Sequence, residues 1–258
     1  MYTPVLFVSH GSPQLALEDQ HPWALTLAGL GPRLPAKAIL VVSAHWWTDD
    51  LRITAAAHPG VMYDFSGFSE ALYTLDYPAP GAPVLAAQLA GLLGQAGFQA
   101  VLDPTRPLDH GAWAVLRHLL PKADVPVLQL SLPRWQPAAL LALGRALAPL
   151  REQGVVILAS GGLVHNLGRL TWDEPGDRAE PWALEAEAWV LDAVRRGDVA
   201  DLADHRARWP QSRAAAPTTD HLDPLFVALG AAGPDAVRDL FRGFQLGSLS
   251  LASLRWDA

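Results

Sequence analysis

Residues 5–10 read Val5-Leu6-Phe7-Val8-Ser9-His10, a run of four apolar residues that leads into a serine and a histidine. A second run, Ile39-Leu40-Val41-Val42, has the same character and leads to His45. Continuous apolar runs of this length are typical of strands covered on both faces, as in a parallel or mixed sheet between two helical layers. The sequence predicts strands over residues 4–9, 38–44, 51–57, 98–103, 126–132 and 155–160.

Segments rich in Ala and Leu with helical spacing lie between the predicted strands, and several begin at a proline and end at a glycine. Alternation of strands and helices predicts one α/β domain, 1–258, with a mixed, mostly parallel central sheet flanked by helices. Residues 171–180 are expected to form a surface loop, and residues 244–251 a last strand that returns to the sheet. The expected helices cover residues 22–30, 83–96, 112–120, 137–153, 181–196, 199–208 and 222–232.

The composition excludes several functional classes. The chain has 258 residues, half of them apolar, a formal net charge of -7 and no cysteine. Without cysteine there are no disulfides, iron–sulfur clusters or thiol nucleophiles, so any metal must be held by His, Asp or Glu. The acidic balance argues against a nucleic-acid partner, and the longest apolar runs are too short to span a membrane. We expect a cytoplasmic protein, since the N-terminus shows no secretory pattern.

Sequence motifs of several common catalytic and nucleotide-binding sites are missing. The chain has no Gly-x-Ser-x-Gly elbow, no phosphate-binding Gly-x-x-x-x-Gly-Lys loop and no His-Glu-x-x-His helix. Gly29-Leu30-Gly31 is the one hint of a dinucleotide fingerprint, but it follows a predicted helix and Leu34 stands where the third glycine is needed. A nucleotide cofactor is therefore not expected.

Five of the nine histidines stand at the ends of predicted elements. His10, His45 and His165 follow three predicted strands, whereas His110 and His221 precede predicted helices. Ligands of open α/β sheets bind beyond the carboxyl ends of the strands, so parallel strands would bring these imidazoles to one edge. The remaining four, His21, His58, His118 and His205, lack this context, and we interpret them as structural or solvated.

Clustered neutral imidazoles suit Fe(II), Zn(II), Ni(II) or Cu(II), and three protein ligands with open positions are typical of a catalytic site. The two remaining histidines would then be available for proton transfer near pH 7. Asp109 and Asp220 each adjoin a histidine, and we interpret them as helix caps or as carboxylates that orient an imidazole, although they could compete as ligands.

Two further side chains are candidates for the substrate pocket. Ten tryptophans are many for this length, and Trp46 and Trp47 directly follow His45, so one of them is expected to wall a pocket for an aromatic substrate. Arg134 follows the predicted strand 126–132 and is the candidate cation for a substrate carboxylate.

A set of short motifs, in order along nearly the whole chain, resembles the DODA-type extradiol aromatic ring-opening dioxygenases, the 4,5-DOPA dioxygenase-like branch of the class III (LigB-like) enzymes. One departure is Ser69, because the family pattern has a proline at this position after Gly67-Phe68. The change lies in a loop and concerns substrate preference more than the chemistry. The motifs are His10-Gly11-Ser12-Pro13, Ser43-Ala44-His45-Trp46, Tyr63-Asp64-Phe65-Ser66-Gly67-Phe68, Tyr77-Pro78-Ala79-Pro80-Gly81, Asp109-His110-Gly111-Ala112-Trp113, Gly161-Gly162-Leu163-Val164-His165-Asn166 and the late His221.

This resemblance implies one divalent metal ion at the edge of the sheet, with His10, His45 and His221 as its ligands. Fe(II) is expected for activity, and Zn(II) is the alternative occupant of the purified protein. His165 resembles the acid–base histidine of the family and also counts as a candidate fourth ligand, while His110 resembles a second active-site histidine that hydrogen-bonds substrate or oxygen. The implied reaction inserts O2 into a DOPA-like catechol and gives a muconic semialdehyde-type product.

Two other functions remain open at this stage. A zinc-dependent hydrolase could use the same histidine cluster to activate water. A non-catalytic module could use a histidine-lined pocket to bind a peptide or another ligand, because a fold by itself does not fix a function. The identity of the catechol, the cleavage position and the oligomeric state are not determined by the sequence.

Overall fold

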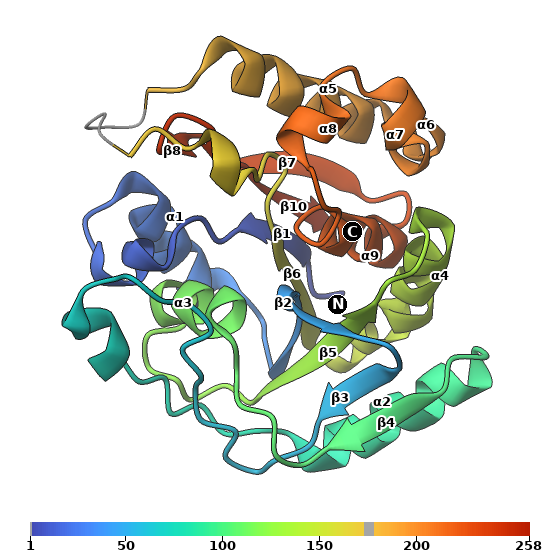
Figure 1. Ribbon diagram of the computed structural model, residues 1–258. Helices are drawn as coiled ribbons and strands as arrows, with labels where there is room; N and C mark the ends of the chain where they lie inside the picture. The colour runs from blue at the N-terminus through green and yellow to red at the C-terminus, as the bar shows by residue number, and fades with distance from the viewer. Residues whose placement is uncertain (1, 173–177) are drawn as a thin grey trace.

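The computed structural model describes residues 2–172 and 178–258, so the centre of the expected loop 171–180 lies outside the described part. Within the described residues, one sheet of eight strands runs in the order β4-β3-β5-β2-β6-β1-β10-β7 (Figure 1). Its strands are β1 (Val5–Ser9), β2 (Ala38–Thr48), β3 (Leu51–Thr54), β4 (Ala100–Asp103), β5 (Val127–Pro133), β6 (Val155–Gly161), β7 (Ala236–Phe241) and β10 (Ser253–Asp257).

The centre of this sheet is parallel. Strand β6 pairs in parallel with β1 and with β2, and β2 pairs in parallel with β5. Strand β3 is antiparallel to β5, and β10 is antiparallel to both β1 and β7. The predicted α/β fold with a mixed, mostly parallel sheet is confirmed.

Both faces of the sheet are covered by helices, as the apolar runs require. Val5 and Phe7 of β1 belong to one apolar core, and Leu6 and Val8 to another. Figure 1 shows α1 (Pro22–Leu30) and α3 (His110–Leu119) on one side of the sheet, and α4 (Pro137–Leu147) and α9 (Asp223–Ala232) on the other. Because neighbouring side chains of a strand point to opposite faces, a continuous apolar run fills two cores at once.

Helix α9 is held close to α4 by two glycines. A Cβ atom on Gly144 would lie 2.2 Å from the carbonyl oxygen of Val227, and one on Gly230 would lie 2.2 Å from that of Leu141. Glycine therefore permits a backbone approach that a larger residue would block. This approach packs α9 closely against α4, and α9 begins two residues after His221.

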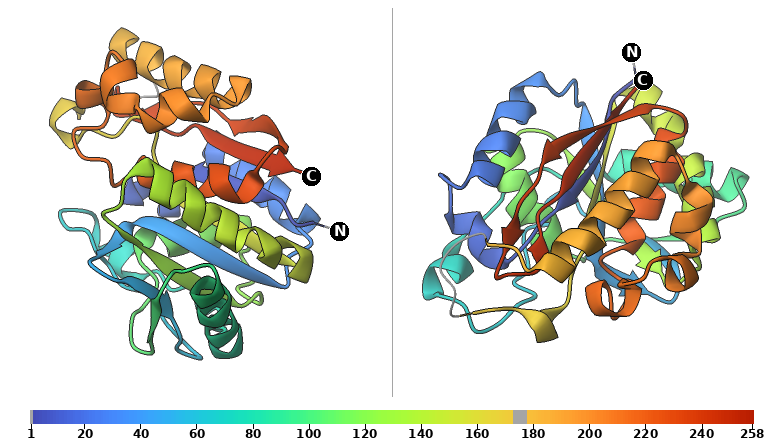
Figure 2. Two further views of the ribbon diagram at one scale, coloured as in Figure 1. Left: turned by 90° about the vertical axis from the view of Figure 1, so that its right-hand side faces the viewer. Right: turned by 90° about the horizontal axis from the view of Figure 1, so that it is seen from above.

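The remaining elements complete the layers around the sheet. Figure 2 shows that α5 to α8 lie together beside the β7 end, whereas α2 lies near β3 and β4. These helices are α2 (Pro83–Gln95), α5 (Pro181–Arg196), α6 (Val199–Ala203), α7 (His205–Arg208) and α8 (Ser212–Ala215). Short 3-10 turns are η1 (Pro13–Leu17), η2 (Gly31–Arg33), η3 (Glu70–Thr74), η4 (Ala148–Gln153) and η5 (Leu167–Arg169).

The prediction for the C-terminal region was wrong. Residues 244–251 do not join the main sheet but contain a small hairpin of β8 (Phe244–Gln245) and β9 (Leu249–Ser250), and the sheet is completed by β7 and β10. Strand β7 is a partly exposed edge strand with Arg238 and Asp239 in its middle, so it lacks the apolar run by which the other strands were predicted.

Several predicted elements have different bounds, and the strand predicted over 51–57 ends at Thr54. The helix predicted over 137–153 ends at Leu147 and continues as the tighter turn η4, which contains Pro149 near its start. The helix predicted over 199–208 divides at Asp204 into α6 and α7. Strand β2 does not end at residue 44 but passes a register irregularity between Val42 and Trp47 and continues to Thr48.

Candidate functional site

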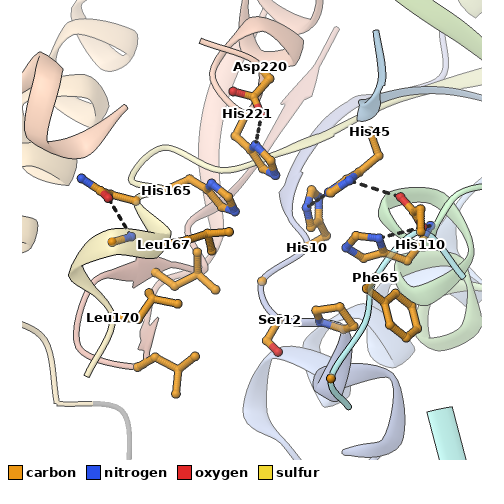
Figure 3. A pocket seen from close by; sticks show the side chains of 18 of the residues that line it. His10, Ser12, His45, Phe65, His110, His165, Leu167, Leu170, Asp220 and His221 are labelled. Atoms are coloured by element: carbon orange, nitrogen blue, oxygen red, sulfur yellow. Dashed lines mark hydrogen bonds and ion pairs between the residues drawn. The ribbon is translucent and has the colours of Figure 1, made fainter. Parts of the chain in front are cut away.

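The histidines singled out in the sequence meet at the carboxyl edge of the parallel strands. His10 directly follows β1, and His45 lies within the irregular stretch of β2, where the Ser43 hydroxyl accepts a hydrogen bond from the His45 backbone amide. Such bulges redirect a side chain beside a functional site. His165 follows β6 and His110 begins α3, and all four side chains line one cavity together with His221 (Figure 3). The predicted convergence of five imidazoles is therefore confirmed.

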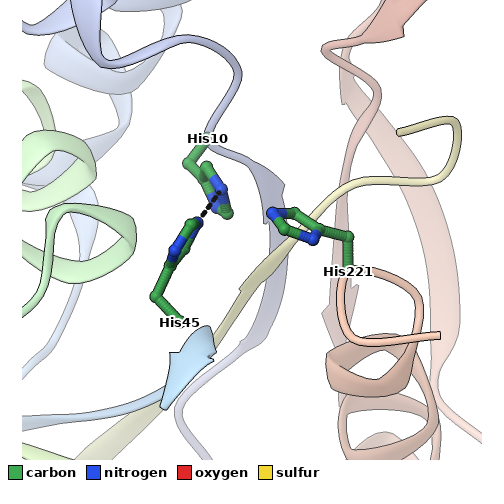
Figure 4. A group of neighbouring side chains, drawn as sticks. All are labelled: His10, His45 and His221. Atoms are coloured by element: carbon green, nitrogen blue, oxygen red, sulfur yellow. Dashed lines mark hydrogen bonds between the residues drawn. The ribbon is translucent and has the colours of Figure 1, made fainter. Parts of the chain in front are cut away.

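The Nε2 atoms of three of these rings point toward a common space. The Nε2 atoms of His10 and His45 lie 3.0 Å apart, and the buried Nε2 of His221 has no hydrogen-bond partner among the described residues. One nitrogen from each ring lies within 4.8 Å of those of the other two (Figure 4). This is a donor set of the kind that holds a metal ion.

Each of the three rings is anchored through its other nitrogen. The Nδ1 atom of His10 lies 2.9 Å from the Ser160 hydroxyl, that of His45 3.2 Å from Asp64, and that of His221 2.8 Å from Asp220. The Ser160 hydroxyl donates its hydrogen to the carbonyl of Gly111 at 2.6 Å, so its oxygen must accept from His10.

These anchors decide which nitrogen of each ring carries the proton. A carboxylate accepts but does not donate, so His45 and His221 are also protonated at Nδ1. All three Nε2 atoms then present lone pairs to the same space, and two lone pairs facing each other at 3.0 Å repel unless a cation lies near them. The donor set therefore fits a divalent metal bound by neutral imidazoles.

The electrostatic environment keeps the imidazoles of His10 and His221 neutral. Burial, and then repulsion from the neighbouring histidines, holds the pKa of His10 well below its usual value. Burial lowers the pKa of His221 to about 4 despite the hydrogen bond to Asp220. Burial alone would raise the pKa of Asp64, but hydrogen bonds from His110 and His45 outweigh it and bring that pKa far below its usual value. Neutral rings beside ionised carboxylates are the state that binds metal.

The other two clustered histidines flank the three converging rings. His110 donates from both its backbone amide and Nδ1 to Oδ1 of Asp64, each at 2.9 Å, which leaves its Nε2 as an acceptor. The ring of His165 stacks on that of His221, with centroids 3.4 Å apart and planes 6° apart. Burial and repulsion from His221 lower the pKa of His165 to about 2, so its ring is neutral at pH 7. Both rings can accept a proton.

Glycine at two positions allows these rings to approach. A Cβ atom on Gly161 would lie 2.2 Å from the backbone oxygen of His221, which accepts a hydrogen bond from the Gly162 amide at 2.8 Å. A Cβ atom on Gly111 would lie 2.5 Å from the Ser43 hydroxyl oxygen. The glycines beside His110 and before His165 are therefore required by close packing around the site.

The two aspartates beside histidines act as the sequence suggested, and a third was missed. Asp109 caps α3 by accepting from the Ala112 amide, and Asp220 orients His221. Asp64, which contacts Nδ1 of both His45 and His110, belongs to the motif at residues 63–68, and the sequence alone indicates no role for it. No local pattern marks it, since it lies in a segment without regular structure. The remaining histidines stay outside the cavity, as expected: His21, His58, His118 and His205.

The cavity has a volume of about 720 Å³, and the wall that faces the histidines is mainly apolar. The expectation that Trp46 or Trp47 forms this wall was wrong, because neither lines the cavity. Trp46 is buried beneath the guanidinium of Arg106, and Trp47 packs under that of Arg134. Arg134 does not line the cavity either, so the expectation that it pairs with a substrate carboxylate has no support there. The wall consists of Phe65, Phe68, Leu167, Leu170, Trp172, Leu246 and Leu249.

Residues 4–250 match the family described as the catalytic LigB subunit of aromatic ring-opening dioxygenase. The chain belongs to the LigB family. This LigB-family chain is 39% identical to a 4,5-DOPA dioxygenase extradiol of Escherichia coli (strain K12), over 98% of this chain and 94% of the relative. It is 37% identical to a protein of the same name from Beta vulgaris, over 98% of this chain and 96% of the relative.

A solved structure also resembles the LigB-family chain along its whole length. The crystal structure of an uncharacterized protein from Escherichia coli K12 matches it with a TM-score of 0.84 and 34% sequence identity, over 99% of this chain and 100% of that chain. The family resemblance inferred from the motifs is confirmed.

Membership of the LigB family establishes the type of reaction. The chain is an oxygen-incorporating enzyme that opens aromatic rings, which favours the dioxygenase over the zinc-dependent hydrolase and the binding module. Its substrates are a small aromatic molecule and O2, and LigB-type enzymes use a metal ion that the histidine triad could hold. Among the described residues, no helix has the length and apolar character needed to cross a membrane.

Proposed function

We propose that this chain cleaves a DOPA-like catechol by extradiol insertion of O2, giving a muconic semialdehyde-type product, with residues 1–258 acting as one catalytic domain. One divalent ion, held by His10, His45 and His221, is the cofactor, and Fe(II) is the active metal. The three Nε2 lone pairs, each fixed by an anchored Nδ1, are the observation that carries this proposal. When bound, Fe(II) would supply electron transfer between catechol and O2 and would acidify the catechol hydroxyls.

His165 acts as the acid–base residue. Its ring stacks on that of His221 and lines the same cavity, so it lies beside the metal ligands, where it can accept the proton of a substrate hydroxyl. The same nitrogen returns the proton in the later ring-opening step. A base held at this place contributes typically about 10²- to 10⁴-fold to a rate.

His110 and the cavity wall position the substrate. The Nε2 atom of His110 accepts a hydrogen bond from a catechol hydroxyl, because Asp64 fixes the proton at Nδ1. Phe65 lies against His110, with ring centroids 5.4 Å apart, and covers this end of the cavity. An apolar cover excludes water, which strengthens the hydrogen bonds within the site.

Oxygen consumption tests the proposal. Protein reconstituted with Fe(II) under anaerobic conditions is offered catechol, methylcatechol and DOPA, and O2 uptake is measured together with a yellow ring-opened product. We expect uptake matched by product, and loss of both in His45→Ala and in protein loaded with redox-inactive Zn(II). His58→Ala, which changes an exposed histidine outside the cavity, is the control that retains activity. Iron-loaded protein that consumes no O2 with any catechol would overturn the proposal.

Two further expectations accompany the proposed reaction. Zn(II) is expected to bind the same three imidazoles, because it accepts neutral imidazole ligands as readily as Fe(II) does. A cytoplasmic location without nucleic-acid or membrane partners stays a prediction from the sequence.

A further inference from the structure

The cavity has two distinct ends. The five clustered histidines form its floor, and the apolar side chains of the wall surround the space above them. Figure 3 shows Leu167 and Leu170 on one side of this space and Phe65 on the other. A catechol whose hydroxyls reach the floor must therefore direct its ring substituent between these apolar side chains.

Lys and Arg are absent from the lining of this cavity among the described residues. The carboxylates of Asp64 and Asp220 line it, and both are committed to histidines. Arg169, beside the wall residue Leu170, does not line the cavity, because its guanidinium lies 4.8 Å from the ring of Trp182. Residues 173–177, outside the described part, contain no Lys or Arg in the sequence. The neutral polar side chains of the lining are Ser12, Ser66, Asn166 and Thr218. A substrate carboxylate directed away from the histidines would thus meet neutral groups and negative charge, with no Lys or Arg among the described lining residues to pair with it.

The apolar wall is held in place by backbone constraints. Leu246 has a φ of +50°, a conformation that costs energy for a residue other than glycine and persists only where its surroundings enforce it. Its carbonyl accepts a hydrogen bond from the Thr171 amide at 2.9 Å, and Gly247 accepts one from the Glu180 amide at 2.7 Å. The Gln245 side chain accepts another from the Ser12 amide at 3.0 Å. The turn between β8 and β9 is therefore hydrogen-bonded to the segment after β1 on one side and to the segments before α5 on the other.

Two wall residues are unusually exposed for their type. The exposed fraction is 63% for Leu167 and 64% for Trp172. Large apolar side chains gathered at the mouth of a cavity are typical of a surface that a ligand covers. These residues would be buried by an apolar substituent and would gain nothing from a charged one.

We propose that the site selects catechols whose ring substituent is uncharged and apolar, such as an alkyl or aryl group, over catechols that carry a carboxylate. This inference rests on the proposed ring cleavage and narrows its substrate class. It narrows the DOPA-like catechol of the proposed function to substrates that share the two ring hydroxyls of DOPA and lack its carboxylate. Each methylene added to the substituent is expected to raise kcat/KM by about fourfold until the cavity is filled.

The test compares dihydrocaffeate with its methyl ester, which has no charge and one additional methyl group; that group alone accounts for about fourfold in kcat/KM. We expect kcat/KM of the Fe(II) enzyme to favour the ester by about tenfold or more. The same preference is expected in the dissociation constants of Zn(II)-loaded protein, measured by quenching of tryptophan fluorescence. An acid that is used and bound as well as its ester would overturn the proposal while leaving ring cleavage intact.

A cation placed in the wall should reverse the preference. Leu167→Arg changes an already exposed side chain and is expected to reduce the ester-to-acid ratio by about tenfold, with Leu170→Arg as a second variant. Leu184→Arg, on the exposed face of α5 and outside the cavity, is the control that leaves the ratio unchanged. If neither wall variant changes the ratio, the wall does not contact the substituent and the proposal fails. If no catechol is turned over but the ester binds more tightly, the proposed reaction fails and the selectivity stands.

Discussion

The Nε2 atom of His10 lies 3.0 Å from the Nε2 atom of His45, and the Nδ1 atom of each ring is bonded to a different side chain. His10 comes from the end of β1 and His45 from the irregular stretch of β2, on either side of β6 in the sheet. Two neutral acceptors at this distance repel each other when no cation is bound. The folded protein is therefore less stable without metal than with it.

Metal binding should therefore stabilise the fold. Zn(II) at about 100 times its dissociation constant is expected to raise the free energy of unfolding by about 2.7 kcal/mol, and a chelator should reverse the gain. Thermal unfolding with and without metal measures this. His45→Ala should remove the shift and His58→Ala should retain it. An equal shift in both variants would place the metal elsewhere.

Asp64→Asn should weaken metal binding about 10- to 100-fold, a typical effect of losing a group that orients a ligand. Asp64 accepts a hydrogen bond from Nδ1 of His110 and lies 3.2 Å from Nδ1 of His45, whereas the amide group of asparagine would turn a donor toward one of them. Titration with Zn(II) measures the loss. Asp50→Asn, at an exposed ion pair with Arg52, is the matched control. Unchanged affinity in Asp64→Asn would show that His45 is oriented without its carboxylate.

His165→Gln should lower turnover by about 10²- to 10⁴-fold and leave the metal content unchanged. The reason is that the three converging Nε2 atoms belong to other residues. Metal analysis of the purified variant, together with O2 uptake, separates the two effects. A large loss of metal would instead identify His165 as a fourth ligand, and full activity would remove it from the mechanism.

The metal-free protein should lose stability as the pH falls from about 7 to about 5. Burial lowers the pKa of six histidines in the folded state, so below about 6.5 the unfolded chain binds protons that the folded chain does not. Each such group lowers the free energy of unfolding by up to about 1.4 kcal/mol per pH unit. These histidines are His10, His110, His118, His165, His205 and His221.

One carboxyl group acts in the opposite direction within this pH range. Burial raises the pKa of Asp223 to about 7, so its folded form gains a proton as the pH falls and offsets one histidine. The net change remains a loss of stability. Urea denaturation at several pH values measures it, and His165→Gln should reduce the slope by about one proton. A stability that is flat over this range would mean that the buried imidazoles titrate normally.

Gly161→Ala should disturb His221 through the backbone. The added Cβ atom would lie 2.2 Å from the carbonyl oxygen of His221, which cannot move without shifting the imidazole. We expect a loss of about 1–3 kcal/mol in stability and weaker Zn(II) binding. Gly91→Ala, in an exposed part of α2 with nothing within 4 Å of its Cβ, should be neutral or stabilising. Native Zn(II) affinity in Gly161→Ala would show that this contact relaxes freely.

The sequence predicted the buried strands of the sheet but not the exposed edge strand β7 or the C-terminal hairpin. Strands β1, β2, β5 and β6 are covered on both faces, so each needs an unbroken apolar run, which stands out in one sequence. The edge strand β7 is partly exposed and carries Arg238 and Asp239, so it lacks such a run. The neighbouring apolar residues Phe244 and Leu249 were therefore taken for the last strand, although they form a separate hairpin.

The residues of the candidate site also fall into those that the sequence predicted and those that it did not. Histidines at the ends of parallel strands must meet at one edge, because parallel strands share a direction, and this holds for His10, His45 and His165. Asp64 could not be placed, since it lies in an irregular segment whose path depends on long-range packing. Trp46 and Trp47 were misplaced because adjacency to His45 along a strand does not determine the direction of a side chain.

The sequence by itself determined the α/β class, the parallel centre of the sheet and the five imidazoles at its edge. These depend on local properties, namely apolar runs, helix boundaries and the residue that follows each strand. Only the tertiary structure decided which nitrogen of each ring points toward the common space between the three rings, and which side chains form the wall of the cavity. Both depend on contacts between distant segments, such as Ser160 with His10 and Leu246 with Thr171. Such contacts exist only once the chain has folded.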